Sequence, residues 1–98
     1  MSPRKHRSPE LKREIAAVAT ALYGYWNPIG IAGLPADEYD SYAPGVLSLL
    51  HASVDDRTIA RHLAMLEARR FSMDPQPLRH LEGVAAQVRS AYRLARGT

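Results

Sequence analysis

The chain of 98 residues contains no cysteine, a single tryptophan, a single phenylalanine and no long apolar run. Without cysteine it can form neither disulfides nor zinc–thiolate sites, so packing alone must stabilise it, as suits a reducing cytoplasm. Apolar runs of a few residues exclude a membrane-spanning helix. The basic start is followed by an amphipathic stretch and not by the apolar block of a signal peptide. We therefore expect a soluble, cytoplasmic protein with one modest core.

Positive charge is also missing from a long central stretch. Residues 14–56 hold six acids and no Lys or Arg, whereas residues 1–13 hold five Lys or Arg against one Glu. Residues 57–98 hold eight Arg against three acids, and the whole chain has a net charge of +3. An acidic middle between two basic ends favours neutralisation within the fold over a single nucleic-acid-binding patch.

A helix is expected to begin at Ser8, which is a suitable N-cap before Pro9 and Glu10. Apolar residues then follow at steps of 4, 3 and 4, which places them on one helical stripe. These residues are Leu11, Ile15, Val18 and Leu22. Gly24 is expected to end this helix, and residues 1–7 are expected to form a disordered basic tail.

The stretch from Tyr25 to Asp40 contains two Pro and two Gly, which break any helical period. Its large apolar residues are too many to leave in water, so we expect a long apolar loop that packs on the core. The second helix is expected to begin at Asp40 or Ser41, with Ser41 as N-cap and Pro44 in the first turn.

Two further helices complete the expected fold. Ser53 begins a variant of the capping box, and Phe71 is expected to close the third helix. The dipeptide Asp74-Pro75 or Gln76-Pro77 then caps a last helix whose apolar residues recur at steps of 3 and 4. They are Leu78, Leu81, Ala85, Val88, Tyr92 and Ala95. The sequence thus predicts an all-α, compact four-helix domain over residues 8–98, with the apolar loop between its first two helices.

Two motifs stand close together in this loop. Trp26-Asn27-Pro28-Ile29-Gly30 is followed, six residues on, by Asp37-Glu38-Tyr39-Asp40. The pairing resembles a small family of bacterial proteins that show Trp-Asp-Pro-Ile-Gly, then Asp-Glu-Tyr-Asp, then an all-helical remainder. The resemblance covers roughly residues 11–73. It implies a bacterial source and a helical fold, and it brings no assigned activity, substrate, cofactor or catalytic residue.

One departure from the family pattern bears on the role of the first motif. Asn27 stands where the family usually has Asp, so the hydrogen-bonding turn is kept and the negative charge is lost. A metal ligand or general base would seldom tolerate that exchange. We therefore interpret the first motif as architecture, with Trp26 as an anchor in the core and Pro28 and Gly30 shaping the backbone. Ile29 of this motif and Tyr39 of the second motif are also interpreted as structural.

The carboxylates Asp37, Glu38 and Asp40 admit three interpretations. They could contact a partner protein, they could serve local structure as a helix cap and a turn, or they could bind a divalent cation together with His51. The alternation of a calcium loop is absent, and the four histidines, His6, His51, His62 and His80, show no metal-binding spacing. We predict a partner contact and no cofactor.

Sequence signatures of common enzymes are absent from the chain. It lacks the Gly-x-Ser-x-Gly of serine hydrolases and any phosphate-binding glycine loop. We therefore predict a non-enzymatic protein-interaction module of the inhibitor or immunity type, with no membrane association. A weak electrostatic nucleic-acid binder that uses the two basic ends is the first alternative. A metal-dependent hydrolase that uses Asp37, Glu38, Asp40 and His51 is the second.

Overall fold

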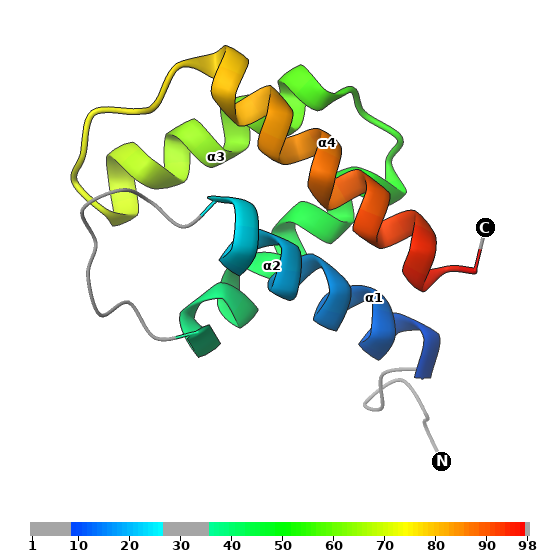
Figure 1. The fold of residues 1–98 in the computed structure, drawn as a ribbon. Coiled ribbons are helices and arrows are strands. Elements are labelled where there is room, and N and C mark those ends of the chain that lie inside the picture. The colour runs from blue at the N-terminus through cyan, green and yellow to red at the C-terminus, as the bar shows by residue number, and fades with distance from the viewer. Residues whose placement is uncertain (1–8, 27–35, 98) are drawn as a thin grey trace.

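The computed structural model describes residues 9–26 and 36–97 (Figure 1). The described chain is helical, and its elements follow in the order α1 (Pro9–Ala21), η2 (Leu22–Trp26), α2 (Ala36–His51), α3 (Asp56–Arg70) and α4 (Leu78–Ala95). The predicted all-α, four-helix domain is confirmed, with one short π-helical turn, η2, added after α1. Within the described ranges, every helix is too short or too polar to cross a membrane.

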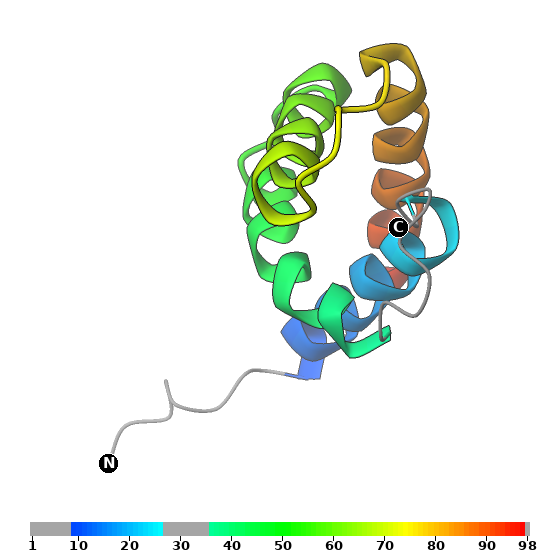
Figure 2. The ribbon, with the colours of Figure 1, turned by 90° about the vertical axis from the view of Figure 1, so that its left-hand side faces the viewer.

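Helix α4 is the central element of the packing. It makes its most extensive contacts with α3 and α1, and α1 in turn packs on α2, whereas α2 and α3 touch little. Figure 2 shows α3 and α4 side by side, with α1 and the start of α2 below them. Because α1 and α4 run in opposite directions, the beginning of α1 lies near the end of α4 (Figure 1).

The core forms where the predicted apolar stripes meet. From α4, Leu81, Val84, Ala85, Val88 and Tyr92 are buried, while Leu78 is partly buried against the same cluster. From the other helices the largest buried side chains are Val18, Leu22, Trp26, Tyr39, Val46, Ile59 and Leu63. Steps of 3 and 4 therefore identified the inner face of each helix correctly.

The end of the first helix differs from the prediction. Gly24 does not stop it, because the chain widens into η2 and continues to Trp26. A π-helical turn adds a residue to the helical repeat. Both Leu22 and Trp26 are buried at its two ends, at 0% and 1% exposure. Gly24 lies inside this turn, where an added Cβ would meet no atom of the described residues within 4 Å.

The second helix begins earlier than predicted. It starts at Ala36, so Ser41 is not its N-cap and Pro44 lies inside the helix. The proline deprives the carbonyl of Asp40 of its helical donor, which normally disfavours such a position. Here Pro44 is exposed, and the longer helix buries Tyr39 completely. Tertiary burial of an aromatic ring thus outweighs the local effect of proline.

The N-cap of the third helix is Asp55, not Ser53. The Asp55 carboxylate accepts hydrogen bonds from the backbone N–H and the hydroxyl of Thr58, at 2.9 and 2.6 Å. Ser53 instead has a φ of 60° and ends α2. Its N–H donates to the Leu50 carbonyl, while that of Val54 donates to the Leu49 carbonyl, as in a Schellman motif.

The remaining boundaries agree with the sequence. Phe71 is the C-cap of α3, and Pro77 is the N-cap of α4, which favours the Gln76-Pro77 alternative. The predicted tail of residues 1–7 and most of the predicted apolar loop lie outside the described residues.

Candidate functional site

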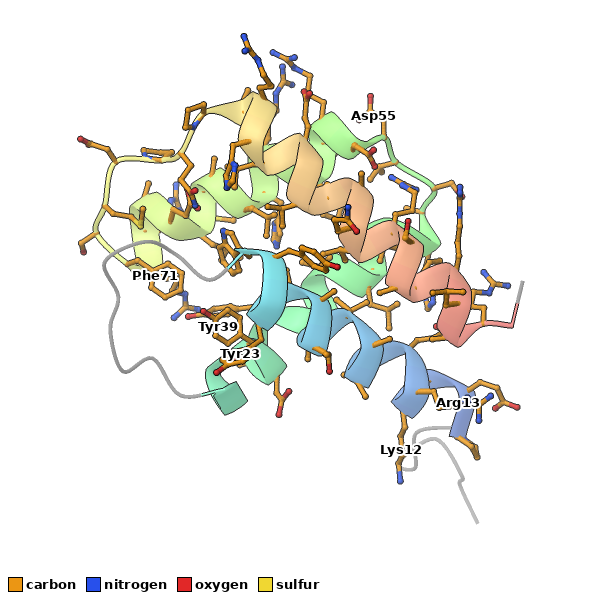
Figure 3. The ribbon with its side chains drawn as sticks, in the orientation of Figure 1. Lys12, Arg13, Tyr23, Tyr39, Asp55 and Phe71 are labelled. Carbon is orange, nitrogen blue, oxygen red and sulfur yellow. The ribbon has the colours of Figure 1, made fainter. Side chains whose placement is uncertain are left out.

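Trp26 occupies the centre of an aromatic cluster. Its ring meets those of Tyr39, Tyr42 and Phe71 edge to face, with ring centroids 5.7–6.2 Å apart. Tyr23 adds a further edge contact to Tyr39; Figure 3 labels Tyr23, Tyr39 and Phe71. Burial raises the pKa of Tyr39, and the neighbouring phenols of Tyr23 and Tyr42 raise it further. The aromatic residues of both motifs therefore belong to one structural cluster.

A buried carboxylate that sequence reasoning missed completes this cluster. Glu67 of α3 is fully buried and accepts a 2.8 Å hydrogen bond from the indole N–H of Trp26. It also accepts hydrogen bonds from the backbone and side-chain N–H groups of Gln76. Glu67 follows Leu63 by four residues on the inner stripe of α3, and that spacing was the available signal. Its neighbours satisfy it inside the protein, so we assign it a structural role.

Most of the first motif and part of the acidic motif fall in stretches that the structure does not describe. Asn27, Pro28, Ile29 and Gly30 lie outside the described residues, and so do the side chains of Asp37 and Glu38. Asp40 is exposed on α2. It lines a shallow hollow of about 280 Å³ together with Lys12, Ile15, Ala16 and Pro44. The one described carboxylate of the acidic motif thus lies on the surface beside α1.

The proposed metal ligands do not come together. Asp40 and His51 lie on the same helix, eleven positions apart, which separates them by roughly 16 Å along its axis. Asp37 and Glu38 lie still further along the helix from His51, and one ion binds ligands only 2–2.6 Å away. In the described part of the chain, no group of three His, Asp or Glu residues is arranged to hold a metal ion.

His51 instead pairs with α1. Its Nε2 lies 2.8 Å from Oε1 of Glu14, and its ring lies 5.8 Å from that of Tyr92. The Tyr92 hydroxyl accepts a 2.7 Å hydrogen bond from the Arg96 guanidinium. A hollow of about 470 Å³ is lined by Glu10, Leu11, Glu14, His51, Tyr92 and Arg96. The Glu14–His51 bond joins α1 to α2, and the His51 ring packs beside Tyr92 of α4.

A carboxylate beside an imidazole can orient a general base, so the Glu14–His51 pair is one element that an active site would need. Among the described residues, its lining contains no Ser, Thr or Lys that could act as a nucleophile beside the imidazole. Its charges are mixed, with Glu10 and Glu14 against Arg96. Such a set favours neither an anionic nor a cationic ligand, and a structural contact between α1 and α2 accounts for it.

A different hollow lies on the outer side of the α1–α4 pair. It measures about 840 Å³, and none of the described residues that line it is charged. Its lining residues are Ala16, Ala17, Thr20, Ala21, Gly24, Tyr25, Ala91, Leu94 and Ala95. Among them, Leu94 is 77% exposed and Tyr25 is 54% exposed. We call this surface the α1–α4 face.

Charge is partly neutralised within the fold, as predicted. Arg89 of α4 bonds Asp56 at 2.8 Å and the carbonyl of Val54, and Arg57 pairs with Glu82 at 3.2 Å. Only the first pair links the acidic middle of the sequence to its basic end. Lys12 and Arg13 belong to the first part of α1, which lies near the end of α4, where Arg93 and Arg96 follow in the sequence (Figure 1).

No protein-family model matches this chain, and neither a curated protein sequence nor a solved structure matches it. The resemblance to the bacterial family with the Trp-Asp-Pro-Ile-Gly and Asp-Glu-Tyr-Asp motifs therefore stays a prediction. The α1–α4 face and the exposed Asp40 of the acidic motif are the surfaces that bear on function.

Proposed function

We propose that this protein is a non-enzymatic interaction module, of the inhibitor or immunity type, that binds a helical segment of a partner protein on its α1–α4 face. The observation that carries the proposal is the uncharged hollow of that face together with the exposure of Leu94. A large aliphatic side chain left 77% exposed beside an apolar hollow is typical of a protein-binding surface.

The lining of the hollow favours a helix as the bound element. Most of its side chains are Ala, Gly or Thr, which allow another backbone to approach closely. Two adjacent helices form a groove between them, and an amphipathic helix fits such a groove with its apolar face inward. Leu94 and Tyr25 then flank the docked helix as larger anchors.

Asp40 of the acidic motif extends this surface on the other side of α1. Ala16 lines both the α1–α4 hollow and the smaller hollow that contains Asp40. A partner seated on the face thus passes close to Asp40. We assign Asp37, Glu38 and Asp40 the role of contacting a cationic group of that partner, which affects the association rate more than the affinity.

The test is affinity capture from the native host, followed by calorimetry with the purified partner. Leu94→Asp should weaken binding at least about tenfold, because it places a charge in the apolar contact. Met65→Asp is the matched control, since Met65 is also an exposed apolar residue but lies on α3. A partner whose affinity is unchanged by Leu94→Asp would exclude the α1–α4 face as its binding site.

The acidic motif is tested with the same partner. The double substitution Asp37→Asn with Glu38→Gln should slow association and reduce its dependence on salt, with a smaller effect on dissociation. Unchanged kinetics at every salt concentration would show that the motif serves the scaffold only.

Nucleic-acid binding remains the second candidate, because the fold brings Lys12 and Arg13 to the same end as Arg93 and Arg96. Glu10 and Glu14 lie at that end too, and Arg96 bonds Tyr92. Binding of duplex DNA should accordingly be weak, independent of sequence and strongly reduced by salt. A tight complex that survives about 0.2 M salt would favour this candidate over the interaction module.

A further inference from the structure

The contact between α2 and α3 is built around one histidine and one glycine. The two helices touch little, although each packs closely against another helix. A Cβ added at Gly45 of α2 would lie 3.5 Å from Nε2 of His62 of α3, so the imidazole edge rests on the α2 backbone. Tyr42 and Leu49 flank Gly45 on the same helical stripe and are partly buried. We call the contact of His62 with this stripe the α2–α3 joint.

Helix α2 is weakest at the residues that form this joint. Pro44 lies inside the helix and has no N–H to donate to the carbonyl of Asp40. Gly45 follows it directly, and glycine in a helix interior loses more backbone entropy on folding than any other residue. Two successive residues therefore make it easier to open the helix at this point. Because His62 packs on the second of them, its position bears on whether α2 stays closed.

On the side of α2, the joint offers no charge that could compensate a proton on His62. The ring is partly buried, and this burial lowers its pKa below 6.5. Asp40 and His51 of α2 face α1 instead, where Asp40 lines a hollow with Lys12 and His51 bonds Glu14. The residues one turn from Gly45 carry no formal charge at neutral pH. They are Ser41, Tyr42, Ser48 and Leu49.

The charged groups of α3 and α4 do not compensate that proton either. From α4, Glu82 and Arg89 pair with the first turn of α3. The carboxylate of Glu67 is satisfied within the aromatic cluster. Arg61, next to His62 in the chain, would oppose a second positive charge. The residues of α3 one turn from His62 are uncharged, and they are Thr58, Ile59, Met65 and Leu66.

From this arrangement we infer that the α2–α3 joint is an acid-sensitive hinge: once protonated, the ring of His62 leaves Gly45 for water, and α2 opens locally around Pro44 and Gly45. The closed joint favours the neutral ring, so opening takes up a proton and becomes easier as the pH falls below 6.5. Asp40 lies ahead of the hinge on α2, so opening displaces it relative to α1. The effect of that displacement on partner binding rests on the proposed function, whereas the hinge itself does not.

Native-state amide hydrogen exchange of the intact chain, read residue by residue and corrected for the intrinsic effect of pH, tests the hinge. Amides of residues 45–49 should exchange through a local opening, so low urea should not speed them, whereas it should speed the core amides of α4. Between about pH 8 and pH 5 the protection of residues 45–49 should fall at least about threefold. His62→Gln should abolish that fall, and His80→Gln, at an exposed position of α4, should retain it.

Two matched glycine substitutions locate the hinge within α2. Gly45→Ala makes only an ordinary contact with His62 and removes the freedom of glycine, so it should slow the local exchange. Gly83→Ala lies in α4, where the added Cβ meets no described atom within 4 Å, and should leave the exchange of α2 unchanged. Circular dichroism confirms that each variant is folded.

Three results would overturn the inference. They are α2 amides that share the urea dependence of the α4 core, an acid response that survives His62→Gln, and equal effects of the two glycine substitutions on α2. The exchange measurement uses the chain alone, so its failure would leave the proposed function standing, and the absence of a partner would leave the hinge standing.

Discussion

The indole N–H of Trp26 donates a hydrogen bond to the buried carboxylate of Glu67, 41 residues further along the chain. The bond joins the end of η2 to α3, and Gln76 donates to the same carboxylate from the segment before α4. One acidic side chain thus holds three parts of the fold in place, so its removal should be strongly destabilising.

Replacing Glu67 with Ala should lower the free energy of unfolding by roughly 3 kcal/mol, because buried N–H groups of Trp26 and Gln76 lose their acceptor. Glu67→Gln retains one carbonyl oxygen and should cost less. Denaturant titration followed by circular dichroism measures both, and it also serves for variants that lack the tryptophan. A double-mutant cycle with Trp26→Phe should show coupling between the two positions, whereas additive effects would refute the shared role.

His62 should make stability depend on pH. Burial lowers its pKa below the ordinary value of 6.5, so the unfolded chain binds the proton more tightly than the folded one. Stability is therefore complete above pH 6.5 and falls as the pH drops through 6.5 toward the folded pKa. His62→Gln should flatten the change in melting temperature between about pH 8 and pH 5. His80 is exposed, so His80→Gln should leave this pH dependence unchanged. A pH dependence that flattens with His80→Gln and not with His62→Gln would contradict the assignment to His62.

Ser53→Gly should stabilise the protein by up to about 1 kcal/mol, because Ser53 holds a left-handed φ of 60° that only glycine adopts without strain. Ser48 offers a matched control, since it is exposed inside α2, where Ser48→Gly should destabilise by about 0.5 kcal/mol. Opposite shifts in the denaturation midpoint are expected. Shifts of the same sign would mean that strain at Ser53 is not relieved.

Asp40 and Asp55 should respond differently to alanine. Asp55 caps α3, and its two hydrogen bonds from Thr58 lower its pKa below 3.8, so Asp55→Ala should lower the melting temperature. Asp40 lies in the second turn of α2 and not at its cap, so Asp40→Ala should change stability by less than about 0.5 kcal/mol. A larger loss at Asp40 would restore its predicted capping role.

The helical stripes were predictable from sequence, because burial of one face imposes a period of 3.6 residues on any helix of this size. Leu81 and Val88 illustrate this, since their spacing alone placed them in the core. The boundaries were less predictable. Pro44 pointed to a helix start that the burial of Tyr39 overrode, and Ser53 suggested a cap although it ends the preceding helix.

The sequence by itself determined an all-helical chain, the inner face of each helix and the core position of Trp26, because these follow from local periodicity and from the cost of exposing large apolar groups. Only the tertiary structure decided that Glu67 is buried against Trp26, that His51 pairs with Glu14 and stands apart from Asp40, and that small residues of α1 and α4 line one hollow. Each of these depends on which helices lie next to one another. That choice is made by the packing of whole faces, and no short stretch of sequence encodes it.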